Sequence, residues 1–260
     1  MSLRAFSWNI NGLRAIIKRG DLQKFIAEHS PDLLALQEIK LHEPQLAELE
    51  LDQLFPDYQF FWNFAKRKGY AGTAIWVKKH LATSPVNLDI KCITDKYGDA
   101  CNEGRITTVK INDILVISMY APNGKEDLSR IPLRLEWDAH INQLLKSHPK
   151  ALFLGDFNVA NEPIDVANPS QKKGKHGFTL EERQDFKNYL AAGFHDIWRE
   201  ENPDQIQYTW WSFRVRERGP NGWRIDYTLT KGIEAKNAQI YEQVRGSDHC
   251  PISVEVERAS

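Results

Sequence analysis

The stretch ALFLGDFNVA, residues 151–160, contains the pattern on which the fold prediction depends. The apolar run Ala151–Leu154 predicts a buried strand, and Gly155, Asp156 and Asn158 follow at the point where that strand ends. Asp and Asn are also common in turns, so this segment alone is compatible with a purely structural turn. In α/β folds, however, ligand sites assemble at the carboxyl ends of strands. The segment therefore predicts a strand that delivers polar side chains to a site.

Other predicted strands end in the same way. Leu3–Trp8 runs into Asn9 and Asn11, another strand ends at Glu38, and a third runs into the segment Tyr120–Gly124. Glutamate has no special preference for turns. A carboxylate at the end of an apolar strand suits a hard cation such as Mg²⁺, which prefers oxygen ligands. The strand ends therefore predict a site that binds metal or phosphate.

The carboxyl-terminal part of the chain adds an acid and an imidazole. Asp226 lies within an apolar run, and His249 directly precedes the last predicted strand. A buried carboxylate is costly without a partner, and in hydrolytic centres its usual partner is an imidazole that it orients. The pattern predicts that Asp226 and His249 pair, with a purely structural role for both as the alternative.

Short apolar runs alternate with amphipathic stretches along the chain, which indicates a mixed α/β fold in one domain, residues 1–260. The predicted strands span Leu3–Trp8, Asp32–Gln37, Tyr58–Trp62, Thr73–Val77, Ile106–Ile111, Ile114–Tyr120, Ala151–Leu154, Gln207–Trp211, Ile225–Leu229 and Ile252–Val256. The predicted helices span Asp21–His29, Glu43–Phe55, Asp127–Ser147 and a segment that starts at a capping box on Thr179 and stops before Gly193. This pattern fits two stacked sheets with outer helices as well as one large mixed sheet.

Composition and motifs exclude several classes of protein. The chain has no HExxH, GxSxG or GxxxxGK[ST] motif, which leaves zinc proteases, serine hydrolases and P-loop enzymes without support. No apolar run approaches the about 18 residues that cross a bilayer. The 3 cysteines show no CxxC spacing, so we expect neither a disulfide framework nor a zinc site, and a reducing compartment fits. A net charge of −1 argues weakly against nucleic acid, although basic clusters at 66–68 and 172–175 offset it.

A series of segments matches, in order along the chain, the motifs of one family. They are SWNINGLRA (Ser7–Ala15), ALQEIK (Ala35–Lys40), RKGYAGTAI (Arg67–Ile75), EGRI (Glu103–Ile106), YAPNG (Tyr120–Gly124), GDFNVA (Gly155–Ala160), GFTLEER (Gly177–Arg183), YTWWSFR (Tyr208–Arg214), GWRIDY (Gly222–Tyr227) and GSDHCP (Gly246–Pro251). On these segments the chain resembles the exonuclease III family of AP endonucleases, within the endonuclease/exonuclease/phosphatase superfamily.

The resemblance implies an α/β fold of four layers, an α-β-β-α sandwich in which two mixed sheets pack face to face with helices outside. It implies a Mg²⁺-dependent DNA repair nuclease, a class II AP endonuclease that cuts the phosphodiester 5′ to an abasic site. A 3′→5′ exonuclease activity and a 3′-phosphatase activity would accompany this cutting, and Mn²⁺ would substitute for Mg²⁺. The implied partner is double-stranded DNA with abasic sites or blocked 3′ ends. We expect a cytoplasmic monomer that associates with the nucleoid through DNA and not with a membrane.

The resemblance also assigns residues to roles. Glu38 would be the principal metal ligand in a set comprising Asn9, Asn11, Glu38, Asp156, Asn158, Asp248 and His249. Asp156 would orient or deprotonate the attacking water, Tyr120 and Asn158 would hold the scissile phosphate, and Asp226 would orient His249. Whether Asp156 or His249 takes the proton of the water stays open, as does the number of metal ions.

Substrate contacts follow from the same comparison. An apolar pocket formed by Trp210, Trp223 and Ile225 would accept a flipped-out sugar that lacks a base. Contacts to DNA would come from Arg14, Arg67, Lys68, Tyr70, Asn123, Lys125, Lys172 and Lys175. The chain departs from some family members at two positions and in one loop: Asn11 stands where they have an aspartate, Lys125 where they have an arginine, and lysines stand where they have asparagines in the loop 172–177.

Three alternatives remain at this point. One keeps the fold but makes the protein a 3′-end-trimming exonuclease or phosphatase with weak abasic incision. Another is a non-catalytic DNA-binding protein on the same fold, and the third is a phosphatase acting on small molecules such as inositol phosphates.

Overall fold

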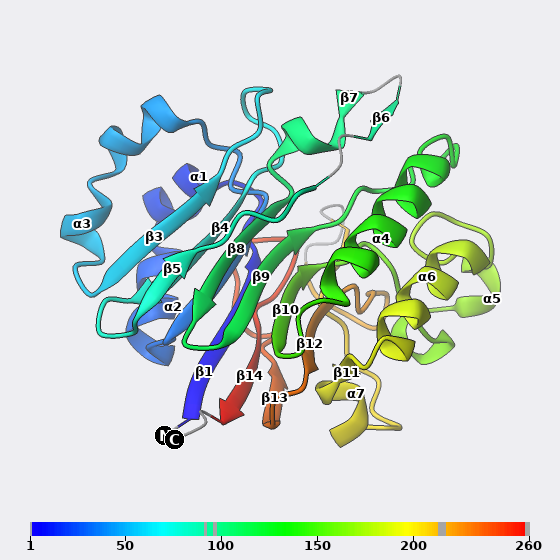
Figure 1. Ribbon diagram of the computed structural model, residues 1–260. Helices are drawn as coiled ribbons and strands as arrows, with labels where there is room; N and C mark the ends of the chain where they lie inside the picture. The colour runs from blue at the N-terminus through cyan, green and yellow to red at the C-terminus, as the bar shows by residue number, and fades with distance from the viewer. Residues whose placement is uncertain (1, 91–92, 96–97, 213–216, 258–260) are drawn as a thin grey trace.

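The computed structural model describes residues 2–90, 93–95, 98–212 and 217–257. Within these residues two six-stranded sheets pack face to face (Figure 1). The first has the order β13-β14-β1-β2-β4-β3, with β1 Ser2–Asn9, β2 Leu33–Gln37, β3 Tyr58–Asn63, β4 Thr73–Lys78, β13 Ala235–Ile240 and β14 Ile252–Glu257. The second has the order β11-β12-β10-β9-β8-β5, with β5 Thr83–Pro85, β8 Ile106–Ile111, β9 Ile114–Tyr120, β10 Ala151–Asp156, β11 His195–Asp196 and β12 Asp226–Lys231.

Helices cover the outer faces of both sheets (Figure 1). The first sheet is covered by α1 Leu13–Arg19, α2 Asp21–His29, the 3₁₀ helix η1 Glu43–Leu49 and α3 Leu51–Leu54. On the side of the second sheet lie α4 Ile131–Leu145, α5 Pro169–Lys172 and α6 Leu180–Ala191, while α7 Ile197–Glu201 packs on β12 and β13. Shorter elements are the 3₁₀ helices η2 Ala100–Glu103 and η3 Pro163–Asp165 and a ribbon of β6 Thr94–Asp95 and β7 Gly98–Asp99.

The central strands are apolar on both faces because each face packs against another layer. Leu152 and Leu154 of β10 lie in the core between the sheets, whereas Ala151 and Phe153 pack against the helical layer that includes Trp137 of α4. The continuous apolar runs in the sequence therefore reflect two-sided burial rather than alternation. The predicted four-layer sandwich is confirmed.

Most predicted strands are present with small shifts at their ends, but Gln207–Trp211 is wrong. That segment forms only isolated bridges, from Trp210 to Trp223 and to His249. The strands β5, β6, β7, β11 and β13 were not predicted. Strand β13, with the sequence AKNAQI, is polar and contains a register shift between Lys236 and Gln239. Polarity and irregularity remove the period-two signal that a strand prediction needs.

The helix predictions succeed where the signals are local. Asp21–His29 is confirmed, and α6 begins after Thr179 with the predicted capping box to Glu182. The predicted helix Glu43–Phe55 is instead divided into η1 and α3 at Glu50, whose φ is +46°. The helix predicted over Asp127–Ser147 is shorter, and α1, α5 and α7 were missed.

The cysteines differ from expectation at one position. Cys101 is disulfide-bonded, which contradicts the prediction of no disulfide, while Cys250 is free and buried. Cys92 lies outside the described residues. Among the described helices, none is both long and apolar enough to cross a bilayer.

Candidate active site

The sheet topology brings the polar strand ends to one edge of the sandwich. β1 and β2 run parallel, with Asn9 paired to Gln37, and β9 and β10 run parallel, with Tyr120 paired to Asp156. β12 is antiparallel to β10, so its first residue, Asp226, is the register partner of Asp156. Parallel strands must end at the same edge, and antiparallel neighbours must begin there. The topology therefore gathers these residues.

The backbone turns sharply directly after these strands. Asn11, Glu38 and Asn158 have φ values of +49°, +48° and +49°. Asparagine tolerates this left-handed conformation, but for glutamate it carries a cost. No residue other than glycine fits at position 155, where φ is +146°, because a Cβ atom there would overlap the Met119 carbonyl oxygen. Backbone strain of this kind is typical of functional sites.

Asn9 joins the two carboxylates at the centre. Its Nδ2 donates to Glu38 Oε1 and to Asp156 Oδ2, each at 2.9 Å, and its Oδ1 accepts the backbone N–H of Asn11 at 3.1 Å. The side chain is fully buried, and all its polar atoms are engaged. Asn9 thus acts as a bridge that sets the spacing of Glu38 and Asp156.

Glu38, Asp156 and His249 form a group that could hold a metal ion. Each places one potential ligand atom within 4.8 Å of the others. The two carboxylates at this spacing supply the oxygen ligands that suit Mg²⁺, and the imidazole lies beside them. The residues present therefore fit a divalent cation.

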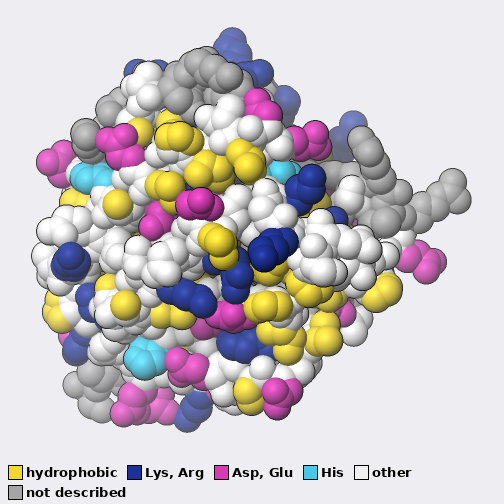
Figure 2. Space-filling view, turned by 90° about the vertical axis from the view of Figure 1, so that its right-hand side faces the viewer, with side chains coloured by type: hydrophobic (Ala, Val, Ile, Leu, Met, Phe, Trp, Pro, Cys, Tyr) yellow, Lys and Arg dark blue, Asp and Glu magenta, His cyan; other side chains and the backbone are white. Residues whose placement is uncertain are grey.

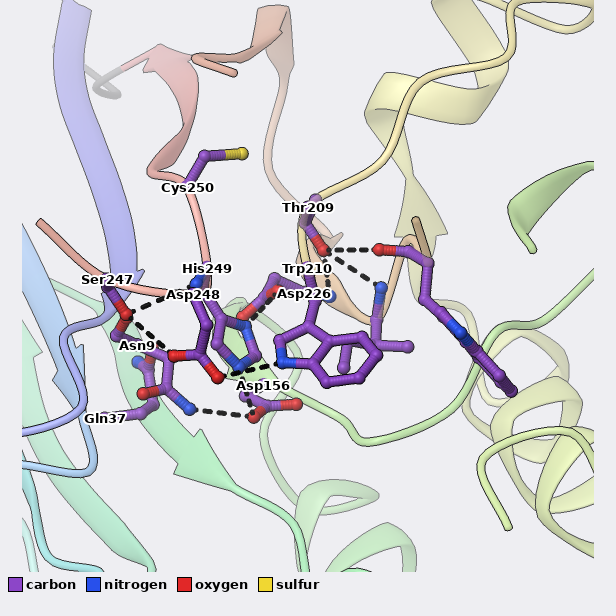
Figure 3. Close-up of polar contacts among 12 residues, drawn as sticks. Asn9, Gln37, Asp156, Thr209, Trp210, Asp226, Ser247, Asp248, His249 and Cys250 are labelled. Atoms are coloured by element: carbon purple, nitrogen blue, oxygen red, sulfur yellow. Dashed lines mark hydrogen bonds and ion pairs between the residues drawn. The ribbon is translucent and has the colours of Figure 1, made fainter. Parts of the chain in front are cut away.

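His249 lies between two buried aspartates (Figure 3). Its Nδ1 donates to Asp226 Oδ2 at 2.8 Å, and its Nε2 lies 3.7 Å from Asp156 Oδ2. Asp226 is fixed in turn by its backbone N–H, which donates to Thr209 Oγ1 at 3.1 Å. The predicted contact between Asp226 and His249 is present. Because Asp226 takes the Nδ1 hydrogen, Nε2 is the ring atom that faces the cleft.

The charges of the centre are strongly coupled. Burial lowers the pKa of His249, but the carboxylates of Asp226 and Asp156 outweigh that effect and raise its pKa to about 10. Burial raises the pKa of Asp156 to about 7, with an opposing contribution from His249 and a further raising one from Asp226. The imidazole is therefore held in its protonated, hydrogen-bond-donating form at neutral pH.

Asp248 connects the centre to a tryptophan. Trp210 Nε1 donates to Asp248 Oδ2 at 3.0 Å, and Asn11 Nδ2 donates to Asp248 Oδ1 at 2.9 Å (Figure 3 shows the first of these). Burial acts to raise the pKa of Asp248, but His249 and these two donors lower it overall. Asp248 is thus an ionised carboxylate that lines the same cleft as the group that could hold a metal ion.

A cleft of about 400 Å³ opens directly over these residues. Its lining includes the polar centre and the predicted pocket: Glu38, Tyr120, Asn123, Asp156, Asn158, Lys172, His176, Gly177, Trp210, Ser212, Asn221, Trp223, Ile225, Asp248 and His249. The backbone N–H of Trp223 donates to the backbone carbonyl oxygen of Trp210 at 2.9 Å. This bond holds the two tryptophans next to each other. The neighbouring Trp211 is buried in the core between the sheets.

Tyr120, Asn123 and Asn158 also line the cleft. Asn123 Nδ2 donates to Asn158 Oδ1 at 3.2 Å, and Asn158 Nδ2 donates to the Ala121 carbonyl oxygen at 2.9 Å. The guanidinium of Arg105 lies 4.7 Å from the centre of the Tyr120 ring. Burial and the charge of Glu38 raise the pKa of Tyr120 well above its usual range, so it is a hydroxyl donor.

The predicted DNA contacts fall into two groups. Asn123 and Lys172 line the cleft, and Lys172 Nζ lies 5.6 Å from the centre of the Trp223 ring. The lysines and arginines at the other predicted positions are exposed outside the cleft: Arg14, Arg67, Lys68, Lys125 and Lys175. Tyr70 is half-buried and accepts from Arg105 Nη2 at 3.1 Å. On the face that carries α4 to α7, basic side chains are interspersed with acidic and hydrophobic ones (Figure 2).

Some residues of the site were missed from the sequence. His176, Ser212 and Asn221 line the cleft, although only the lysine-rich sequence around His176 could have drawn attention to it. Lys40 Nζ pairs with Glu38 Oε2 at 2.9 Å and also contacts Asn11 Oδ1.

Buried arginines support the site from behind and were also missed. Arg134 donates to the carbonyl oxygens of Pro122 and Phe157, at 3.0 and 2.6 Å, and so joins the loops after β9 and β10. Arg224 Nη2 pairs with Asp196 Oδ2 at 2.7 Å and lies in sequence between the pocket residues Trp223 and Ile225. Arginine is normally predicted as exposed, so a sequence gives no signal for such positions.

Comparisons with known proteins agree with this geometry. A family model described as the Endonuclease/Exonuclease/phosphatase family matches residues 6–249. An exodeoxyribonuclease of Bacillus subtilis is 35% identical over 97% of this chain and 98% of its own length. Among solved structures, an AP endonuclease of Leishmania major superposes with a TM-score of 0.86 at 26% identity, covering 99% of this chain and 88% of that one. A 3′-5′ exonuclease of Neisseria meningitidis gives a TM-score of 0.83 at 25% identity over 98% and 100% of the two chains. The chain therefore belongs to the Endonuclease/Exonuclease/phosphatase family.

Proposed function

We propose that this DNA repair nuclease hydrolyses the phosphodiester 5′ to an abasic site in double-stranded DNA, as a Mg²⁺-dependent monomer. The observation that carries the proposal is the shared cleft. The carboxylate and imidazole centre and the aromatic pocket of Trp210, Trp223 and Ile225 line the same cavity. A sugar without a base would fit against the tryptophans while its phosphate reaches the polar centre. The named AP endonuclease and exodeoxyribonuclease relatives support this assignment.

Glu38 and Asp156 would hold the cation, with the protonated imidazole of His249 beside it, and Asn9, Asn11, Asn158 and Asp248 would fix their positions. When bound, Mg²⁺ supplies Lewis-acid stabilisation of negative charge on the phosphate oxygens, and Mn²⁺ would serve in its place. Asn9 limits the separation of the two carboxylates through its 2.9 Å hydrogen bonds to both. This rigid spacing suits a hard cation that demands near-ideal geometry.

The side chains of the cleft would activate the water and stabilise the negative charge on the phosphate. Asp156 would orient the attacking water and accept its proton, because its carboxylate lines the cleft whereas the other candidate, His249, is held protonated by Asp226 and Asp156. His249 Nε2 would donate to a phosphate oxygen, held in place by Asp226. Tyr120 and Asn158 would add donors for the developing negative charge, and Asn123 positions Asn158.

The exposed basic residues would position the duplex without reading its sequence. Lys172 would contact DNA at the mouth of the pocket. Contacts to phosphates farther along the duplex would come from Arg14, Arg67, Lys68, Lys125 and Lys175, with Tyr70 beside Arg67. Phosphate contacts of this kind make binding dependent on salt and independent of sequence.

An incision assay tests the proposal. A duplex oligonucleotide with one internal abasic analogue should be cut 5′ to that site in Mg²⁺, while the undamaged duplex stays intact. Excess chelator should abolish the cutting, and added Mg²⁺ should restore it. Gel electrophoresis of end-labelled strands measures the products. Cutting that persists in chelator would contradict the metal requirement, and no cutting in Mg²⁺ would contradict the proposed substrate.

Trimming of 3′ ends is a second candidate, favoured by the similarity to the 3′-5′ exonuclease of Neisseria meningitidis over almost the whole chain. The same duplex with a 3′-phosphate end instead of the abasic analogue separates the two. Faster removal of the 3′-phosphate than abasic incision would reverse the ranking.

Trp223→Ala should lower kcat/KM for abasic incision about tenfold more than for 3′-phosphate removal, because the variant removes one wall of the pocket. Steady-state kinetics on the two duplexes give the ratio. Trp62→Ala is the control, since Trp62 is half-buried on β3 and lies outside the cleft. An equal loss of kcat/KM on both substrates in Trp223→Ala would contradict a role of the pocket in selecting the abasic site.

A further inference from the structure

One wall of the cleft comes from residues 172–177, here called the wall segment, which connects α5 to α6. Lys172, His176 and Gly177 of this segment line the cleft. Lys173, Gly174 and Lys175 are at the surface, whereas Gly177 is buried. Because most side chains of this loop are not buried, the loop depends on hydrogen bonds to its backbone for a fixed position.

Gly177 is the point at which the wall segment meets the site. Its φ is +76°, and a Cβ atom there would lie 3.3 Å from the Asn158 carbonyl oxygen and 3.4 Å from the ring of Trp223. Its carbonyl oxygen accepts the N–H of Ala160 at 2.8 Å. A displacement of Gly177 would therefore disturb its contacts with the Asn158 backbone and with the ring of Trp223.

Glu182 holds the amide of Gly177. The side chain is fully buried, and its Oε2 accepts the backbone N–H of Gly177 at 2.8 Å. The same oxygen accepts the N–H and the hydroxyl of Thr179, at 3.2 and 2.8 Å. The bonds to Thr179 belong to the capping of α6, but the bond to Gly177 does not. Glu182 therefore does more than cap a helix: it ties the wall segment to α6.

The other carboxylate oxygen faces the loop after β9. A Cβ atom at Gly124 would lie 3.1 Å from Glu182 Oε1, so the carboxylate occupies the space between the wall segment and the loop that carries Asn123. Loss of this group would remove a charged acceptor from the Gly177 amide and leave a gap between the two sides.

We propose that Glu182 is a positioning residue that fixes the wall segment against Trp223 and so favours an internal abasic site over a 3′ end. The inference rests on the proposed function. An internal abasic sugar must fit against Trp223, whose ring the wall segment supports at Gly177, while duplex continues on both sides. A terminal 3′-phosphate has no such continuation and needs only the polar centre. A loosened wall should therefore impair the first substrate more.

Four variants test this role: Glu182→Ala, Glu182→Gln, Thr179→Ala and Glu181→Ala. Glu182→Gln keeps an acceptor oxygen for the Gly177 amide. Thr179→Ala removes the hydroxyl that caps α6 and also donates to Glu182 Oε2, but it keeps both partners of the Gly177 bond. Glu181 is the exposed neighbour and serves as the matched control. For each variant, kcat and KM are measured on the abasic duplex and on the 3′-phosphate duplex, together with the melting temperature.

We expect Glu182→Ala to lower kcat/KM on the abasic duplex about tenfold more than on the 3′-phosphate duplex. Glu182→Gln should restore most of the ratio, and Glu181→Ala should leave it unchanged. Thr179→Ala should lower the melting temperature with the ratio unchanged. If Glu182→Ala does not fold, Glu182→Asp, which is one methylene shorter, takes its place and should show the same change in ratio.

An unchanged ratio in Glu182→Ala, or the same change in Thr179→Ala, would overturn the proposal, because helix capping would then explain the effect. Failure of the wild-type protein to cut the abasic duplex is a separate result. It would contradict the proposed function itself, whatever the variants show.

Discussion

Replacement of Asp156 by asparagine is expected to lower kcat on an abasic duplex about 10³-fold while the Kd for that duplex changes little. The amide has nearly the shape of the carboxylate but cannot accept a proton from water. Asp156 also accepts hydrogen bonds at both oxygens, from Asn9 Nδ2 and from the Asn158 N–H, each at 2.9 Å. An amide places its NH₂ against one of these donors, so the orientation of the group is lost as well.

Single-turnover kinetics measure the rate, and equilibrium binding in chelator measures the affinity for DNA. Asp204→Asn, at an exposed position, is the control for the same chemical change. Circular dichroism and the melting temperature verify that the Asp156 variant is folded. Turnover within about tenfold of the wild type would rule out Asp156 as the proton acceptor.

Glu38→Gln is expected to raise the Mg²⁺ concentration needed for half-maximal rate by at least about 100-fold, since loss of a ligand should exceed the effect of losing an outer-sphere partner. Glutamine is preferable to alanine for two structural reasons. It retains an acceptor for Asn9 Nδ2, and it leaves the left-handed backbone, φ +48°, with a side chain of the same size. The measured effect then reports the lost charge.

The test is a titration of incision rate against Mg²⁺, repeated with Mn²⁺. Glu43→Gln, on the exposed start of η1, is the matched control. A Mg²⁺ titration that coincides with that of the wild type would count against Glu38 as the principal ligand, whatever the rate at saturation.

Asp156 and Glu38 can both be identified from the sequence alone, because the signals that mark them are local. Asp156 is the last residue of β10 and Glu38 directly follows β2, and the end of such an apolar run is visible in sequence. The same holds for α6, whose capping box involves residues only three positions apart. Hydrogen bonds and burial patterns that involve residues close together in the chain can therefore be predicted from the sequence.

The secondary-structure predictions that failed depend on features that a short stretch of sequence does not report. Gln207–Trp211 has the composition of a strand, yet its partners are loop segments around Trp223 and His249, so it forms bridges and no ladder. Glu43–Phe55 has helical periodicity, but the left-handed conformation of Glu50 divides it. Composition in a short window does not report which partner a segment will meet.

The sequence by itself determined the class of fold, the positions of the principal strands and the set of acid, amide and imidazole groups, because burial periods and capping act over a few residues. Only the tertiary structure decided how those groups meet. Asn9 reaches Asp156 across 147 positions, and Trp210 reaches Asp248 across 38. Tertiary structure also decided that Glu182 is buried beneath the cleft wall, where a charged residue would be expected at the surface. The physical reason is that a buried polar group is stabilised by whichever partner lies within hydrogen-bond distance in space, and sequence separation does not specify that partner.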